Sequence, residues 1–174
     1  MGKTRELELQ NLLSVAQASY LVYQVSHWKV KGDDYYGDHL LLQRLYESAQ
    51  DYVDQLGERL VGLESSGAID VGKQASGIAL VVNQVVKQVG EDPMKQSMKI
   101  TQELLAELQD AYKNIKSDDQ MTLGLDDLVM SISNTVETNM YLLKQATAPG
   151  SRHGAKKNPG TRRNAAQIKR RLMR

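Results

Sequence analysis

The sequence predicts an all-α fold, and three observations support this prediction. Apolar residues recur at steps of three and four along most of the chain, which is the spacing of one face of an α-helix. Alternating β-branched residues, the pattern of a half-buried strand, are rare. Phe is absent, and only three prolines interrupt the 174 residues. With 41% hydrophobic residues, the chain can build the core of one ordinary domain.

The first two predicted helices form a hairpin. The first runs over about residues 4–31, and Gly32 is placed to end it as a left-handed C-cap. Asp33 or Asp34 can cap the second helix, which runs over about residues 35–63. The apolar face of the first helix consists of Leu12, Leu13, Ala16, Tyr20 and Tyr23.

A long connection separates this hairpin from the rest of the predicted bundle. We expect residues 67–93 to be irregular, except that the apolar segment 78–82 could form a short helix packed on a neighbouring surface. Further helices are expected over residues 93–116 and 124–146. Two hairpin helices, a long crossover and two more helices are the ferritin-like topology of a four-helix bundle.

The end of the chain differs from the rest in charge. From Gln145 onward there is no Asp or Glu, yet nine of the 22 Lys and Arg residues lie there. The preceding residues 1–144 keep 13 basic residues against 21 acidic ones, a net charge of −8. We therefore expect residues 1–148 to form the bundle and residues 149–174 to be a mobile basic tail.

The chain contains no cysteine, which excludes disulfides, thiolate nucleophiles and cysteine-ligated metal clusters. Any metal would be held by nitrogen and oxygen ligands. The N-terminal residues are charged without a long apolar run behind them, and Glu6 stands where a myristoylation signal requires Ser or Thr. We expect a cytoplasmic protein without an anchor or a membrane span.

Two histidines and two carboxylates form a candidate metal site. His27 and His39 flank the first interhelical turn, and Asp54 and Glu58 lie one turn apart on one face of the second helix. His39 and Asp54 are separated by about 22 Å along this helix, whereas ligands lie within about 2 Å of their metal ion. One chain therefore cannot bring them together, but two antiparallel copies of the helix about a two-fold axis can.

The midpoint of such a pairing falls at Ser48 and Ala49, whose small side chains are expected to let the two helices approach closely. Each half of the candidate site also has an ordinary interpretation. A histidine at a helix end is often structural, and a pair of carboxylates is often a solvated face.

These residues also carry a family resemblance. The resemblance is carried by the segment His27-Trp28-Lys29-Val30-Lys31-Gly32, by the twelve-residue step from His27 to His39, and by the pattern Asp54-x-x-x-Glu58-Arg59. Together they closely resemble the signature of the DNA-protecting, ferritin-like proteins called Dps. The resemblance is strong over the first two helices and extends to the others by length and pattern. It implies oxidation of iron(II), preferably by hydrogen peroxide, and storage of the ferric mineral in a hollow shell of twelve subunits.

Carried over by position, the resemblance implies that His27 and His39 of one subunit meet Asp54 and Glu58 of its mate, with Trp28 packed beside them. Gln43 departs from the family pattern, which usually has Asp one turn after the second histidine.

An amide is a weaker and uncharged donor, so we expect the second iron to bind less tightly. Glu47, one further turn along, is a candidate replacement for the missing carboxylate. The departure at Gln43 leaves an alternative open, in which the chain forms a structural DNA-binding or cargo shell with a weakened or inactive iron site.

A second acidic cluster surrounds the start of the last predicted helix. The resemblance implies that this region lines a three-fold pore, where repeated carboxylates would concentrate entering cations. Asp residues near a helix start also complement its dipole, so simple capping remains an alternative. The cluster consists of Asp118, Asp119, Asp126 and Asp127.

The basic tail has the charge to neutralise DNA phosphates. No aromatic residue is interleaved with these charges, so we expect salt-sensitive binding without sequence preference, strengthened by repetition in a shell, and a nucleoid-associated protein. A solvated tail, or one that docks on an acidic partner, is the alternative. The residues concerned are Lys156, Lys157, Arg162, Arg163, Lys169, Arg170 and Arg171.

Overall fold

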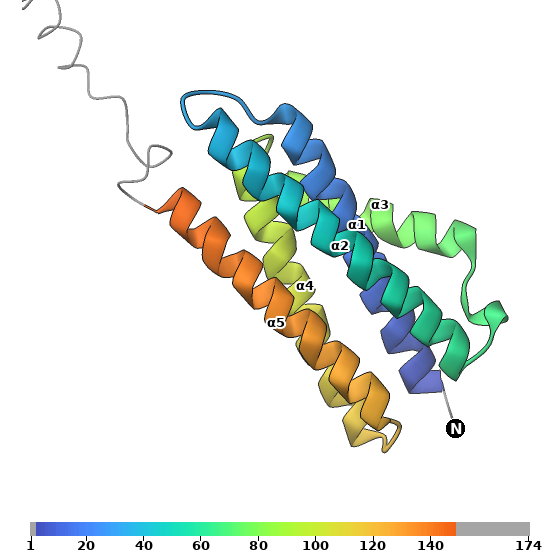
Figure 1. Ribbon diagram of the computed structural model, residues 1–174. Coiled ribbons are helices and arrows are strands. Elements are labelled where there is room, and N and C mark those ends of the chain that lie inside the picture. The colour runs from blue at the N-terminus through green and yellow to red at the C-terminus, as the bar shows by residue number, and fades with distance from the viewer. Residues whose placement is uncertain (1–2, 149–174) are drawn as a thin grey trace, which may run out of the picture.

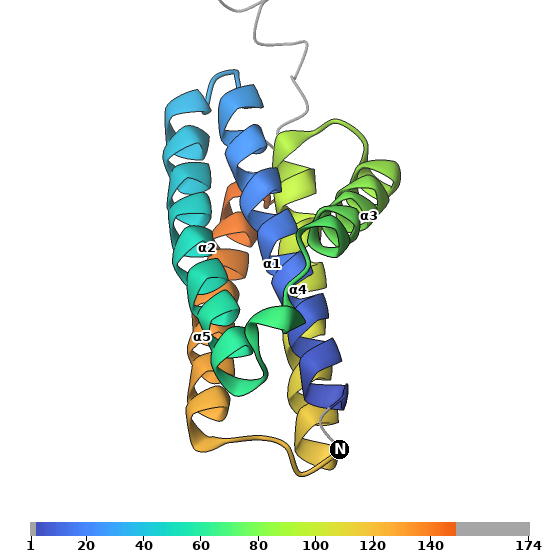
Figure 2. The same cartoon turned by 90° about the vertical axis from the view of Figure 1, so that its right-hand side faces the viewer.

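The computed structural model describes residues 3–148, and this part of the chain contains helices and short connections without a strand. The helices are α1 (Lys3–Lys29), α2 (Tyr35–Leu63), the 3-10 turn η1 (Ser66–Ala68), α3 (Val71–Val89), α4 (Pro93–Ser117) and α5 (Leu123–Thr147). Figure 1 shows α1, α2, α4 and α5 side by side as a bundle, and Figure 2 shows that α3 crosses its outside against α1 and α4. The predicted ferritin-like bundle with one long crossover is confirmed.

The predicted tail, with its basic residues and its boundary at residue 149, lies outside the described residues. Within them, none of the helices is long and apolar enough to span a membrane.

Local capping interactions explain where three of the helices begin. The Asp70 carboxylate accepts a hydrogen bond from the backbone N–H of Lys73, at the start of α3. The Asp92 carboxylate accepts hydrogen bonds from the backbone N–H groups of Met94 and Lys95, and Pro93 occupies the first helical position of α4. The hydroxyl of Thr122 caps α5 by accepting from Leu125. Each cap satisfies a backbone donor that the helix itself cannot satisfy.

The first predicted hairpin is largely confirmed. Helix α2 has the predicted bounds, while α1 ends at Lys29, two residues earlier than expected. Gly32 has a positive φ of 113°, so it serves the turn between the helices rather than the helix end itself. Asp34 occupies the N-cap position of α2, but its side chain makes no capping hydrogen bond.

The prediction for the crossover was wrong in its extent. A helix of 19 residues, α3, replaces the short helix expected at residues 78–82. Within this helix, a Cβ at Gly77 would lie 2.8 Å from the hydroxyl oxygen of Ser14 on α1. This glycine therefore permits close packing of α3 on α1. The helix ends at Gly90, whose φ is +71°.

The core lies between the four long helices, and leucine is its most frequent residue. Within it, two tyrosines bury their hydroxyl groups in hydrogen bonds. The Tyr23 hydroxyl lies 2.6 Å from Thr101 Oγ1, and the Tyr52 hydroxyl lies 2.9 Å from Ser19 Oγ. The fully buried leucines include Leu12, Leu42, Leu45, Leu104 and Leu108.

Arg5 ties three elements together at the end of the bundle where the chain begins. Its Nε donates to the Glu64 carboxylate at 2.6 Å, directly after α2. Its two terminal nitrogens donate to the carbonyl oxygens of Leu63 and Gln120, at 3.3 and 3.2 Å. One guanidinium thereby fixes the connection between α4 and α5, which carries Asp118 and Asp119, against the ends of α1 and α2.

Candidate metal centre

The two histidines of the bundle lie side by side, where the end of α1 meets the start of α2. Their rings are stacked, with centroids 3.6 Å apart and planes 24° apart. His27 Nδ1 lies 2.9 Å from the carbonyl oxygen of His39, and His39 Nδ1 lies 3.1 Å from that of His27. Because a carbonyl oxygen only accepts, both Nδ1 atoms must carry the proton. In the neutral rings, both Nε2 atoms therefore keep the lone pair that binds a metal ion.

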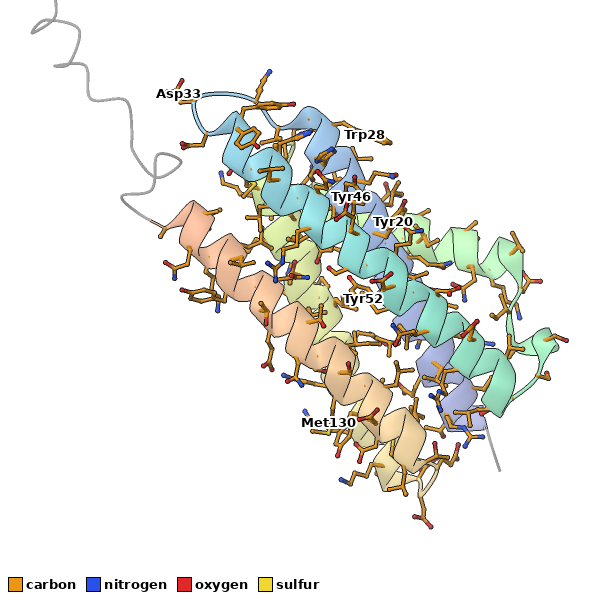
Figure 3. The ribbon with its side chains drawn as sticks, viewed as in Figure 1. Tyr20, Trp28, Asp33, Tyr46, Tyr52 and Met130 are labelled. Carbon is orange, nitrogen blue, oxygen red and sulfur yellow. The ribbon has the colours of Figure 1, made fainter. Side chains whose placement is uncertain are left out.

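Aromatic side chains hold these two rings in place. Tyr46 meets the His27 ring edge-on, with centroids 5.2 Å apart, and Tyr35 stacks on His39 at 5.0 Å. Tyr20 in turn packs edge-on against Tyr46, and Figure 3 shows both of these tyrosines beneath the tip of the hairpin. Trp28, by contrast, is 66% exposed in the single chain.

The two predicted carboxylates lie further along α2. Asp54 and Glu58 are exposed and share the outer face of this helix. Among the described residues, no group of three or more His, Asp or Glu side chains is placed to hold one metal ion. A single chain therefore brings the two histidines together and keeps the two carboxylates on one face, but it does not join the two pairs.

The side chains of Gln43 and Glu47 lie on α2 between these two pairs. Gln43 Nε2 donates a hydrogen bond of 2.7 Å to Glu47 Oε1. The amide nitrogen is thereby committed to Glu47, while the amide oxygen remains as a possible metal donor. Within residues 3–148, neither side chain belongs to a group of ligands that could hold a metal ion.

The role predicted for Ser48 and Ala49 was wrong. Ala49 is fully buried, and the Ser48 hydroxyl bonds to the Leu45 carbonyl and to the Asn139 side chain of α5. Both small residues therefore face the inside of the bundle and cannot ease the approach of a second α2. The exposed residues at this level are polar or acidic: Glu47, Gln50 and Asp51.

The second acidic cluster surrounds the connection between α4 and α5. Asp118 occupies the C-cap position of α4, and Asp119 follows with a positive φ of 55°. Asp126 lies in the first turn of α5, half-buried, and Asp127 is exposed beside it. Since Thr122 supplies the side-chain cap of α5, none of these carboxylates is needed for that hydrogen bond. Asp126 still complements the dipole of α5.

Comparison with known proteins yields relatives named for DNA binding or DNA protection, although no family model matches the chain. A nutrient stress-induced DNA-binding protein of Nostoc is 40% identical over 67 residues, which are 38% of this chain and 36% of the relative. DNA protection during starvation protein 2 of Bacillus anthracis is 24% identical over 119 residues, covering 68% of this chain and 79% of the relative. The match to the Nostoc protein thus spans only about a third of that relative's length.

Solved structures extend the similarity to the whole bundle. Dps from Microbacterium arborescens, solved in a high iron form, has a TM-score of 0.66 at 22% identity, covering 84% of this chain and 93% of that one. Dps92 from Deinococcus radiodurans has a TM-score of 0.56 at 18% identity, covering 88% and 96%. This chain is thus similar in sequence, over part of its length, to proteins named for DNA binding or DNA protection, and similar in fold, over most of its length, to two solved Dps structures.

Proposed function

We propose that this chain is the subunit of a mini-ferritin that oxidises iron(II) with hydrogen peroxide and stores the ferric mineral inside a hollow, dodecameric shell. The observation that carries the proposal is the histidine pair. Two rings are locked by reciprocal Nδ1 hydrogen bonds so that both Nε2 atoms are available. A purely structural histidine pair does not need two free ring nitrogens, whereas a metal site does.

The rest of the proposed site comes from a second subunit. Antiparallel pairing of two α2 helices would bring His27 and His39 of one copy to Asp54 and Glu58 of the other, and would form two such sites per pair. Carboxylates are hard and anionic, so they stabilise iron(III) over iron(II), while neutral imidazole holds iron without adding charge. Two iron(II) ions supply the two electrons that reduce one hydrogen peroxide molecule to water, so no hydroxyl radical need be released.

Gln43 and Glu47 are proposed to complete the site around the second iron. The amide oxygen of Gln43 and the carboxylate of Glu47 are the candidate donors for the second iron, and their hydrogen bond orients both side chains toward the same region. The carboxylates of Asp118, Asp119, Asp126 and Asp127 are proposed to attract iron(II) at a pore between subunits.

Iron oxidation tests the proposal directly. The assembled protein is mixed with iron(II) under anaerobic conditions, hydrogen peroxide is added, and ferric absorbance is followed against a protein-free control. We expect faster formation of iron(III) than in the control, and a soluble mineral. A rate equal to that of the control would favour the alternative, in which the chain forms a structural DNA-binding or cargo shell.

We also propose that residues 149–174 bind DNA without sequence preference, which would place the protein in the cytoplasm at the nucleoid. The support is the charge of this segment and the DNA-binding relatives. A truncated chain ending at residue 148 should lose most of its affinity in a gel-shift series, and the affinity of the full chain should fall steeply with salt. Equal DNA binding by the two chains would remove this role.

A further inference from the structure

Arg5 joins the start of α1 to the connection between α4 and α5 through two hydrogen bonds to Gln120. Its backbone N–H donates to Gln120 Oε1 at 3.1 Å, and its Nη1 donates to the Gln120 carbonyl oxygen at 3.2 Å. Gln120 Nε2 in turn donates to Asp118 Oδ2 at 3.4 Å. Figure 2 shows the start of the chain beside this connection. A continuous line of hydrogen bonds therefore leads from Arg5 to the Asp118 carboxylate.

The connection has few other restraints along its own backbone. The N–H groups of residues 118, 119 and 120 donate to carbonyl oxygens in the last turn of α4, and Asp119 lies between them with a φ of 55°. A positive φ is uncommon for a residue that carries a side chain, although Asp is among those that adopt it. Arg5 adds contacts from a second helix to these local bonds, and so restrains the connection from outside α4.

Glu64 neutralises the charge of Arg5 beside the acidic connection. Its carboxylate accepts from Arg5 Nε at 2.6 Å, and only 18% of the Arg5 side chain and 14% of the Glu64 side chain are exposed. An unpaired guanidinium here would weaken the attraction of the neighbouring carboxylates for cations. With Glu64 in place, the planar fork of Arg5 supplies directed hydrogen bonds without a net positive charge. We call Arg5, Glu64 and Gln120 the Arg5 clamp.

The carboxylates around this connection keep free capacity for a cation. Asp118 and Asp119 are exposed, and Asp126 Oδ1 is buried without a hydrogen-bond partner in the part of the chain that the structure describes. Oxygen ligands that are already fixed bind a cation more tightly than mobile ones, because they need not be ordered on binding. The position of the connection should therefore affect how well it attracts a divalent cation.

We propose that Arg5, acting through Gln120, is a positioning residue that holds the Asp118 carboxylate where it attracts iron(II). This inference rests on the proposed function, which assigns the acidic connection to a pore between subunits. It adds that the start of α1 controls the order of that connection, and that Glu64 keeps the clamp electrically neutral.

Hydrogen exchange tests whether the clamp orders the connection. In the assembled, full-length variants Arg5→Met and Gln120→Met, we expect the backbone amides of residues 118–120 to exchange about tenfold faster than in the wild type. Size-exclusion chromatography must show the same assembled size. Gln120→Met keeps the ion pair of Arg5 with Glu64 and changes no charge, so it tests the same contact if Arg5→Met does not assemble. Unchanged exchange in both variants would overturn the clamp.

The response to iron(II) tests whether this order matters for cation attraction. Initial rates of iron(III) formation with hydrogen peroxide are measured against iron(II) concentration at low ionic strength. In both clamp variants we expect the half-saturating concentration to rise about threefold, with an unchanged maximal rate. Charge alone predicts the opposite for Arg5→Met, because the variant loses a positive charge and should attract iron(II) more strongly.

Lys113→Met is the matched control, because it removes one positive charge from an exposed position of α4 and leaves the clamp intact. Its half-saturating concentration should be equal to that of the wild type or lower. An unchanged or lowered half-saturating concentration in the clamp variants would contradict the positioning role.

Manganese(II) gives a readout of cation binding that does not depend on oxidation. Its dissociation constant, measured by electron paramagnetic resonance, should also rise in the clamp variants and not in Lys113→Met. If the wild type fails to oxidise iron while the clamp variants bind manganese(II) more weakly, the proposed function alone is removed. Iron oxidation by the wild type, together with equal manganese(II) binding by the clamp variants, would remove the positioning role alone.

Discussion

Replacement of His27 or Asp54 by Ala is expected to reduce peroxide-dependent iron oxidation to the rate of the protein-free control. Each proposed site uses one histidine pair and one carboxylate pair, so either change damages both sites of a homogeneous pair of subunits. The loss should appear as ferric absorbance no faster than the control. Circular dichroism must show the same helicity, because His27 also bonds to the His39 carbonyl.

Mixing the two variants separates a shared site from one contained in a single chain. A pair with one His27→Ala subunit and one Asp54→Ala subunit has one damaged site and one intact site. Random equal mixing makes half of all pairs mixed, so about a quarter of the wild-type activity should return. The matched control mixes His27→Ala with His39→Ala, where each site still lacks one histidine and no activity should return. Equal results from the two mixtures would contradict sharing.

The ends of a helix were predictable wherever a capping residue directly precedes or follows a segment with helically spaced apolar residues. Asp92 and Pro93 mark the start of α4 in the sequence as they do in the structure. The length of helix α3 was not predictable because glycine is ambiguous: Gly77 has the local character of a helix breaker, while its role is to admit Ser14 of the neighbouring helix. Such a contact between distant segments has no local signal in the sequence.

Part of the candidate site was predictable from the regular geometry of the helix. The rise per residue of a helix fixes how far His39 lies from Asp54, so their separation within one chain follows from the spacing alone. The prediction for Ala49 was wrong because this residue lies four positions after Leu45 and seven before Leu56, so the helical period places it on their buried face. The reciprocal bonds of His27 and His39 depend on the axial alignment of two helices and on both ring orientations, which the spacing does not specify.

Alkaline unfolding is the second large effect that we expect, and its origin is the buried tyrosine pair of the core. Burial raises the pKa of Tyr23 well above its ordinary value, and the neighbouring Tyr52 raises it further. Burial likewise raises the pKa of Tyr52, against the lowering effect of its hydrogen bond with Ser19. Both phenols therefore stay protonated in the folded protein at a pH where they ionise in the unfolded chain.

The two buried tyrosines lower the stability of the folded protein at high pH, because the folded and unfolded states then hold different numbers of protons. Below about pH 10 both states hold the phenolic protons, so the pair adds no pH dependence. Above that pH the unfolded chain releases them and the folded protein does not, so the free energy of unfolding falls as the pH rises. Each buried tyrosine contributes a loss of up to about 1.4 kcal/mol per pH unit, until its own folded pKa is reached.

The variant Tyr23→Phe isolates this contribution. Phe keeps the ring in the core, and the Thr101 hydroxyl keeps its bond to the Ser97 carbonyl, so the variant should fold. Urea unfolding between about pH 9 and pH 11 should show a shallower loss of stability than in the wild type, by up to about 1.4 kcal/mol per pH unit. Tyr141→Phe, at a position 60% exposed, is the matched control and should follow the wild-type slope. Because lysine deprotonation affects all three proteins alike, parallel slopes for wild type and Tyr23→Phe would show that the buried phenol does not drive alkaline unfolding.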